Sequence, residues 1–329
     1  MRRFTLFATP FLTALALATP ALAEDITIGL SWNSKTQPLE RAWEDYMKAE
    51  AELQGAAAGK TIKWVINVAD ADPSRQASNI EDLITQGVSV IVARPEDAGA
   101  IGASIRAAEA AGIPFITFDR ASANAKPTAH VGGDSYDQAL TTAEAFADLL
   151  GKQGVVGQCI ELQGALTDIN AVNRSKGWTD VDAKRDEIST LVQVPTEWNP
   201  DLFRSGLANA LRANPDANCA FIPSDFAITA VQAALEEAGR WAPAGDPKHF
   251  WLATQDLLPV AVPLMEGGYI DVSTTYDAYK HAEELVRVVL AINAGTDLGC
   301  GPDGCLAKGR MVTPETIATT ENLWSKTYE

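Results

Sequence analysis

The chain has 329 residues and a formal charge of −17 at pH 7, because 43 acidic residues outnumber 26 basic ones. A surface this acidic argues against nucleic acid or an anionic membrane as partner, since both attract positively charged proteins. The apolar fraction of 47% is that of an ordinary globular chain. The length exceeds what one hydrophobic core usually organises, which predicts two domains.

The first 23 residues predict a secretory signal peptide. Arg2 and Arg3 form a charged start, an apolar stretch follows, and Ala21-Leu22-Ala23 offers a small-x-small cleavage site. We therefore expect cleavage after Ala23 and export of the mature chain. No later segment approaches the ~20 apolar residues that a membrane span needs.

The first half of the mature chain alternates strand patterns with helix patterns. From Leu39 to Met47 the apolar positions fall on one helical face. Asp72-Pro73 offers an N-cap followed by proline at the first helical position. Strands are predicted at 26–31, 61–69, 88–94, 114–120 and 129–133, and helices from Leu39, from Asp72 and over 98–111.

The second half of the chain repeats this alternation of strand and helix patterns. A helix pattern over 136–150 begins it, and Asn199-Pro200 repeats the cap-and-proline device. Strands are predicted at 155–164, 188–195, 217–225, 249–256 and 269–276, with helices between them. A long amphipathic segment over 277–294 and a turn-rich extended region close the chain.

Strands that alternate with helices predict parallel sheets covered by helices on both faces. Two such sets in succession predict an α/β protein with two doubly wound domains. Ligands of open parallel sheets bind outside the carboxyl ends of the strands. Asp119 and Arg120 end the apolar strand PFITFDR, residues 114–120, so they stand at such an edge. The alternative is an exposed salt bridge between these neighbours. If the pair instead holds a ligand, Asp119 is expected to stabilise the empty protein by only ~0–1 kcal/mol.

Four cysteines in an exported chain favour disulfides. Cys300 and Cys305 bracket the turn-forming stretch GPDG and are expected to form a small looped bridge. Cys159 and Cys219 are expected to be bridged if their strands are sheet neighbours, and to be free thiols otherwise. The three histidines are scattered and no His/Cys cluster has zinc spacing, so we expect no metal and no other cofactor.

The sequence contains none of the common enzyme motifs. It has no G-x-S-x-G turn, no Walker A loop and no G-x-G-x-x-G after the first strand. Paired carboxylates could indicate a glycosidase, but such enzymes are rarely built as two similar α/β halves. We therefore expect a protein that is not an enzyme.

Several short motifs follow one another in a familiar order: Asp119-Arg120 at a strand end, Arg174-Ser175-Lys176-Gly177-Trp178 on a helix, and Ser224-Asp225 and Asp256 at later strand ends. With LERAW (39–43) and TQD (254–256), they resemble the periplasmic sugar-binding proteins of ABC transporters, the ribose- and xylose-binding type of the type I periplasmic binding protein family. The resemblance covers essentially the whole mature chain. LERAW, TQD and the stretch from Asp168 through Asn170 to Arg174 are closer to the xylose-binding members.

The chain also departs from the ribose-type pattern. Leu39 and Glu40 stand where those proteins have paired phenylalanines, Ser224 replaces an asparagine, and the last polar contact falls at Tyr276. The stretch GCGPDGC near the C-terminus is not a general family feature. These departures leave the identity of the sugar open.

The resemblance implies two doubly wound lobes joined by three chain crossings near residues 133, 276 and 310. Residues 24–133 plus 277–310 would form the N-terminal lobe, and 134–276 plus 311–329 the C-terminal lobe. A monosaccharide, with a pentose such as xylose as first choice, would bind between the lobes in the periplasm. The implied partners are an ABC permease in the inner membrane and, as a further option, a chemoreceptor.

Two alternatives remain beside the sugar receptor. The family also contains receptors for sugar alcohols and for small signalling molecules that feed a chemoreceptor. The ligand domain of a transcriptional repressor shares the two lobes, but the signal peptide and the lack of an N-terminal helix-turn-helix argue against it.

A sugar receptor needs carboxylates that accept from hydroxyls, arginines that donate paired bonds, and aromatic rings for the C–H face of the sugar. Asp225 and Asp256 could instead cap the following helices, the tryptophans could be core residues, and Glu40 could complement a helix dipole. The candidate ligand-binding residues are Asp119, Arg120, Arg174, Asp256, Asp225, Trp198, Trp32, Glu40, Arg41, Asp168, Asn170, Gln255 and Tyr276.

Overall fold

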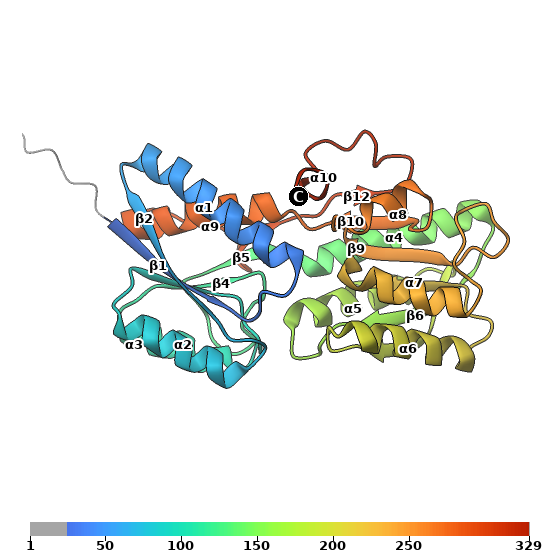
Figure 1. Cartoon of the computed structure of the whole chain (residues 1–329), viewed down its shortest axis with the longest axis horizontal. Helices are drawn as coiled ribbons and strands as arrows, with labels where there is room; N and C mark the ends of the chain where they lie inside the picture. Colours follow the sequence, from blue (N-terminus) through green and yellow to red (C-terminus); the bar gives the residue numbers. More distant parts are fainter. Residues whose placement is uncertain (1–24, 329) are drawn as a thin grey trace, which may run out of the picture.

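The computed structural model describes residues 25–328, so the expected signal peptide, residues 1–23, lies outside the described residues. The described chain forms two lobes that lie side by side along the long axis of the molecule (Figure 1). Each lobe has one six-stranded sheet with helices on both faces. The predicted α/β fold of two lobes is therefore confirmed.

The sheet of the first lobe is parallel throughout. Its strands, in spatial order, are β11 (Cys305–Ala307), β5 (Ala129–Gly133), β4 (Phe115–Phe118), β3 (Val90–Ala93), β1 (Asp25–Trp32) and β2 (Thr61–Val68). Helices α1 (Pro38–Ala58) and α9 (Ala278–Ala294) cover one face, and α2 (Pro73–Thr85) and α3 (Ile101–Ala110) cover the other (Figure 1). Hydrophobic residues alternate between these two faces along each central strand, which is how a doubly covered sheet buries both sides.

The sheet of the second lobe repeats this arrangement with one difference. Its strands, in spatial order, are β12 (Met311–Val312), β10 (Val272–Thr275), β9 (Trp251–Asp256), β8 (Cys219–Ile222), β6 (Gly157–Gln163) and β7 (Ile188–Pro195). Helices α4 (Ser135–Gln153) and α5 (Ile169–Asp182) cover one face, and α6 (Pro200–Ala213), α7 (Ile228–Glu237) and α8 (Val262–Glu266) cover the other. The two-residue edge strand β12 runs antiparallel to β10, whereas the sequence predicts parallel strands alone.

The chain passes between the two sheets three times: after β5, after β10, and between β11 and β12. Two of these passages end in an aspartate that caps the next helix. The Asp134 side chain accepts from the backbone N–H of Asp137 at the start of α4, and Asp277 accepts from Lys280 at the start of α9. Such caps satisfy helix N–H groups that lack a partner and so define where each helix begins.

The C-terminal segment contacts both lobes. Leu323 belongs to the core of the second lobe, whereas Trp324, the first residue of α10 (Trp324–Thr327), belongs to the core of the first. Trp324 Nε1 donates to the carbonyl of Tyr276 at 2.7 Å, and the Tyr328 hydroxyl donates to Asp45 on α1 at 2.7 Å. The resemblance places residues 311–329 in the second lobe, but Trp324 and Tyr328 contact the first lobe.

Both expected disulfides are present. Cys159 on β6 and Cys219 on β8 are direct partners in neighbouring parallel strands, with Cα atoms 4.4 Å apart. Cys300 and Cys305 close the GPDG turn that leads into β11. The first bridge ties the centre of the second sheet, and the second bridge closes a short loop at the edge of the first.

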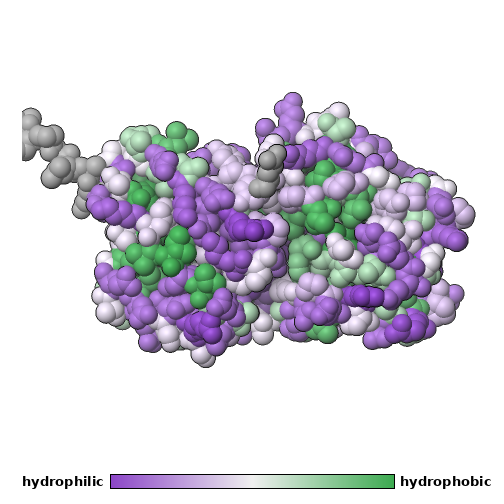
Figure 2. Space-filling view, viewed as in Figure 1, coloured by the Kyte–Doolittle hydropathy of each residue, from purple (hydrophilic) through white to green (hydrophobic). Residues whose placement is uncertain are grey.

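Hydrophilic residues cover much of the face shown in Figure 2, with smaller hydrophobic groups on both lobes. This distribution fits the excess of acidic residues in the composition. Within residues 25–328, none of the helices combines the length and apolar character needed to cross a membrane.

His249 and Asp271 form a buried ion pair beside β9. The Nδ1 atom of His249 lies 2.8 Å from the carbonyl of Ala242, and Nε2 lies 3.0 Å from the Asp271 carboxylate. Both neighbours can accept, so the protonated ring can donate from both of its nitrogens. Burial lowers the pKa of His249, but the hydrogen bond and charge of Asp271, together with the Ala242 carbonyl and the charge of Asp246, raise this pKa above its ordinary value. Burial raises the pKa of Asp271, yet the imidazolium and the Leu252 N–H both donate to its charged form.

Replacing His249 by glutamine is expected to destabilise the protein more at about pH 6 than at about pH 9. Because the folded-state pKa is raised, the stabilisation is complete below the ordinary value of about 6.5 and is lost as the pH rises through the folded-state value. Urea unfolding of wild type and His249→Gln at both pH values measures the difference. The exposed neighbour variant Lys248→Ala is the control, and a difference that grows with pH would contradict the charged pair.

Candidate functional site

A small pocket, with a volume of about 30 Å³, lies between the two lobes. It sits where the carboxyl ends of strands from both sheets face each other, the location that the fold predicts for a ligand. Its lining mixes charged groups with aromatic rings and one aliphatic side chain. The lining residues are Gln37, Leu39, Trp43, Arg94, Asp119, Arg120, Asp168, Asn170, Arg174, Trp198, Ser224, Phe226, Asp256 and Tyr276.

Asp119 is the central acceptor of the pocket, and its ion-pair partner is not its neighbour in the chain. Its carboxylate lies 2.5 Å from Nε of Arg94, which follows β3. It also accepts from the Tyr276 hydroxyl at 2.5 Å and from the Asn170 amide at 3.1 Å. Burial alone would raise the pKa of Asp119, but Arg94 and Arg120 lower it below its ordinary value. The exposed Asp119–Arg120 salt bridge, one of the two alternatives from the sequence, is therefore wrong.

Arg120 reaches across to the second lobe. Its Nε lies 2.8 Å from the carboxylate of Asp168, which caps α5 through the N–H of Asn170. This buried Nε has no aligned hydrogen-bond acceptor, so the contact is an ion pair by distance alone. Asn170 crosses the same boundary when it donates to Asp119. The lobes thus touch through polar groups of the pocket itself.

Arg174 and Asp256 form the matching pair inside the second lobe. Nη2 of Arg174, on α5, lies 2.6 Å from Asp256 at the end of β9. The guanidinium also lies over the Tyr276 ring, 5.2 Å from its centroid. Burial raises the pKa of Asp256, and Arg174 opposes this only in part. Burial and Asp119 raise the pKa of Tyr276 well above its ordinary value, so its hydroxyl stays protonated and donates.

The aromatic surfaces come from both lobes. Trp198 and Phe226 belong to the second lobe and contact each other edge to face, with centroids 6.1 Å apart. From the first lobe, Trp43 on α1 lines the pocket beneath the Arg94 guanidinium, which lies 5.5 Å from the ring centroid. Charged groups can hydrogen-bond to hydroxyls, and aromatic faces can pack against C–H groups. The pocket therefore offers both kinds of contact that a ring-shaped, hydroxylated ligand requires.

The structure brings eight of the predicted residues to the pocket lining: Asp119, Arg120, Arg174, Asp256, Trp198, Asp168, Asn170 and Tyr276.

Five predicted residues lie elsewhere. Trp32 is fully buried in the core of the first lobe and donates to Glu44, because it shares a strand face with other core residues. Arg41 is exposed on the outside of α1. Gln255 points to the opposite side of β9 from Asp256 and donates to Thr142.

Glu40 and Asp225 are buried behind the lining. Glu40 accepts from Arg94 at 3.0 Å and from the backbone N–H of Gln37 at 2.8 Å, so it supports an arginine of the pocket. Asp225 accepts from the backbone N–H of Leu258 and from the Thr254 hydroxyl, which stabilises the loop after β9. Burial raises the pKa of Asp225 well above its ordinary value.

Six lining residues are absent from the predicted candidates: Gln37, Leu39, Trp43, Arg94, Ser224 and Phe226. Arg94 carried the clearest signal, because it follows an apolar strand at the same sheet edge as Asp119. Trp43 carried a second one, since it lies one helical turn after Leu39 and so on the same face of α1.

The backbone is strained at three lining residues. Asp119, Trp198 and Asp256 have φ angles of 63°, 54° and 85°, in a region that side-chain-bearing residues seldom adopt. Such conformations persist where the surroundings hold them, and they cluster at functional sites. Each of the three turns a pocket side chain out of the end of a strand or loop.

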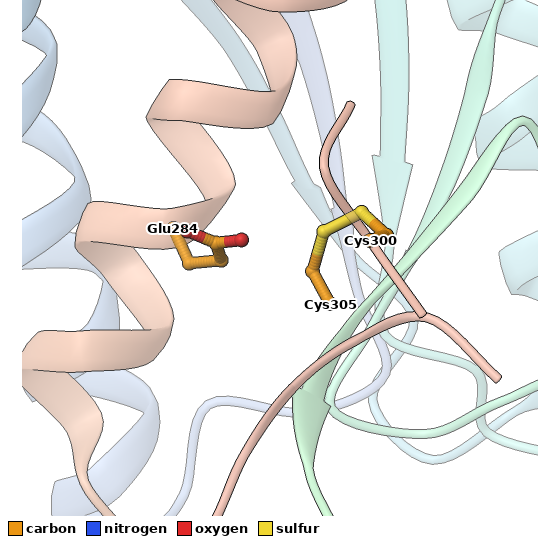
Figure 3. A group of neighbouring side chains, drawn as sticks. All are labelled: Glu284, Cys300 and Cys305. Carbon is orange, nitrogen blue, oxygen red and sulfur yellow. A yellow bond between two sulfur atoms is a disulfide. The ribbon is translucent and has the colours of Figure 1, made fainter. Parts of the chain in front are cut away.

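Glu284, Cys300 and Cys305 form the one group of potential metal ligands found among residues 25–328 (Figure 3). The two sulfurs are bonded to each other, as Figure 3 shows. Metal binding by cysteine requires free thiolates, so this group does not fit a metal ion.

Comparisons with known proteins agree with this geometry. The family model "Periplasmic binding protein domain" matches residues 28–297. The chain is 29% identical to the ribose import binding protein RbsB of Bacillus subtilis over 241 residues, which cover 70% of this chain and 74% of that protein. It is 30% identical to a xylitol-binding protein of Mycolicibacterium smegmatis over 185 residues, 56% of this chain and 52% of that one.

A solved structure shares the whole architecture. It is an ABC transporter solute binding protein from Bacillus halodurans C-125 with bound myo-inositol, and it superposes with a TM-score of 0.78 at 22% identity. The match covers 94% of this chain and all of that one, 100%. These relatives are binding proteins and not enzymes. The matched family domain spans most of the chain, and the chain therefore belongs to the periplasmic binding protein family.

Proposed function

We propose that this protein is the solute-binding receptor of an ABC importer and that it binds an uncharged monosaccharide between its lobes. The observation that carries the proposal is the balance of charge in the lining. Its three arginines, Arg94, Arg120 and Arg174, face three aspartates, Asp119, Asp168 and Asp256. This balance leaves no net charge for an ionic ligand to neutralise, but it offers many donors and acceptors to hydroxyl groups.

Within this class we infer a pentose such as xylose as the first candidate ligand. The support is the likeness of LERAW (39–43) and TQD (254–256) to xylose-binding members, together with a relative named for ribose. A sugar alcohol is the second candidate, because another relative is named for xylitol and a structural neighbour holds myo-inositol. A chemoreceptor as a further partner finds support in one neighbour, the fructose-binding periplasmic domain of a hybrid two component system.

We infer that ligand binding favours a closed arrangement of the lobes, which the permease then recognises. The hinge of this movement would be the three crossings near residues 133, 276 and 310, with lobes of 24–133 plus 277–310 and 134–276 plus 311–329. Tyr276 lies at one crossing and donates to Asp119. A ligand held by Asp119 would therefore act directly on the hinge. The receptor would work in the periplasm after cleavage behind Ala23.

A monosaccharide or polyol is expected to raise the melting temperature of the mature protein. At a concentration 100-fold above its dissociation constant, the ligand stabilises the folded state by about 2.7 kcal/mol through mass action. A thermal-shift panel of pentoses, hexoses and polyols measures this, with D-xylose and xylitol in parallel to separate the two candidates. Glucose 6-phosphate serves as a charged control, because the balanced lining should reject it. If only charged compounds shift the melting temperature, the proposal is wrong.

A further inference from the structure

Trp198 enters the pocket from the loop between β7 and α6, and three features hold its ring in place. Its Nε1 donates to the Asp168 carboxylate at 2.9 Å, and its ring contacts Phe226. The third feature is Gly164, the first residue after β6. A Cβ atom at Gly164 would lie 2.1, 2.3 and 2.5 Å from Cζ2, Cε2 and Cη2 of the Trp198 ring.

The backbone itself does not require glycine at this position. Gly164 is absent from the residues with a φ angle in the left-handed region, so an alanine could adopt its conformation without strain. The glycine is therefore needed for the space that the Trp198 ring occupies. The first lobe contains a similar glycine packed against an aromatic ring, because a Cβ at Gly133 would lie 2.1 Å from Cε2 of Tyr276.

We propose that Gly164 is a positioning residue, which sets the depth of the Trp198 ring in the pocket and so determines how well the pocket fits its sugar or polyol. This inference rests on the proposed function. A methyl group at position 164 would displace the ring and break its hydrogen bond to Asp168. Asp168 also faces Arg120 of the first lobe at 2.8 Å. The displacement would therefore disturb both an aromatic wall of the pocket and a charged contact between the lobes.

The test is a double-mutant cycle of Gly164→Ala and Trp198→Phe, read by calorimetric titration. The titrants are D-xylose, xylitol, D-ribose and myo-inositol, and the compound that binds wild type most tightly is used throughout. Gly164→Ala is expected to raise Kd about tenfold or more, as overpacking of one side chain does. In the Trp198→Phe background, where the smaller ring leaves room for the methyl group, the same change should raise Kd less than about twofold.

A second measurement needs no ligand. The indole N–H signal of Trp198 in a ¹⁵N NMR spectrum is identified by its loss in Trp198→Phe, and Gly164→Ala is expected to shift it. Gly206→Ala is the matched control, because its Cβ would lie 2.6 Å from Cγ1 of Val194, away from the pocket. That variant should lose stability while Kd and the indole signal stay unchanged.

Two results would overturn the inference: an equal rise in Kd in both backgrounds, or an unmoved indole signal in Gly164→Ala. If wild type binds none of the four compounds, the proposed function fails, while the indole signal still decides whether Gly164 seats the ring.

Discussion

Asp119→Ala is expected to lose ligand binding and, in addition, a large part of the stability of the empty protein. Asp119 is 3% exposed and pairs with Arg94, which is 7% exposed. Its removal leaves the guanidinium with Glu40 and Asn33 as partners. Leaving a buried charge without a partner costs about 3–5 kcal/mol, and we expect a loss near the lower end of this range because Glu40 still neutralises Arg94. Loss of a charge-assisted acceptor should also weaken binding of a hydroxylated ligand about tenfold or more.

Urea unfolding and calorimetric titration measure the two halves of this prediction. Asp119→Asn is a useful second variant, because asparagine keeps the shape and tolerates the left-handed backbone at this position. A loss shared by both variants then reflects the missing charge. Glu237, an exposed carboxylate paired with Arg204, provides the matched control, and Glu237→Ala should change neither quantity measurably. Unchanged stability of Asp119→Ala and Asp119→Asn would show that Arg94 does not depend on this carboxylate.

The sequence predicts the opposite for stability, and the reason lies in side-chain direction. Asp119 and Arg120 are adjacent, so an exposed pair at a strand end was a natural expectation. With φ at 63°, however, Asp119 turns back toward Arg94 after the neighbouring strand, while Arg120 points to Asp168 in the other lobe. Neither partner is near in sequence. A pattern of residue types locates the edge of a sheet, but it does not say which charges meet there.

The fold was predictable because its signals are local and repeated. Alternating strand and helix patterns, proline after a cap at Asp72 and Asn199, and a signal-like start all lie within short windows. The rule that ligands bind at carboxyl ends of parallel strands then directed attention to Asp119 and Asp256. Both line the pocket.

Trp32 and Trp43, two of the tryptophans of the first lobe, show how a site prediction fails. Trp32 was selected as a stacking ring in the loop after the predicted strand 26–31. The strand β1 in fact includes it, and it shares the face of Ile26, Ile28 and Leu30, all buried in the core. Strict application of the period-two rule would have assigned it to that core. Trp43 lines the pocket instead. Trp43 lies on the apolar face of an amphipathic helix. Such a pattern alone does not say whether a residue on that face packs in the core or lines the pocket.

The C-terminal segment shows a different limit. Residues 313–323 have turn-forming composition without periodicity, so only the resemblance assigned the segment 311–329 to the second lobe. Ile317 and Leu323 do lie in the core of that lobe, but Trp324 lies in the core of the first. The placement depends on single contacts such as Trp324 Nε1 with the carbonyl of Tyr276. Contacts of this kind depend on the three-dimensional path of the chain.

Removal of the Cys159–Cys219 bridge is expected to lower the free energy of unfolding by about 4 kcal/mol, because the bridge closes a loop of 60 residues in the unfolded chain. The double variant Cys159→Ala/Cys219→Ala avoids burying a new hydroxyl, since both sulfurs are fully buried. Urea unfolding under non-reducing conditions measures the loss. Ligand affinity should stay unchanged, because both cysteines lie within their strands and outside the pocket lining.

The second bridge provides the matched comparison. Cys300→Ala/Cys305→Ala opens a loop of only 5 residues, for which the same chain-entropy relation gives about 2 kcal/mol. The ratio of the two losses therefore tests the cause as well as the size. Equal decreases in the free energy of unfolding would mean that loop length has no influence. The stabilisation would then come from native packing around the sulfurs. A loss below about 1 kcal/mol for the first bridge would mean that this bridge restricts the unfolded chain far less than the chain-entropy relation requires.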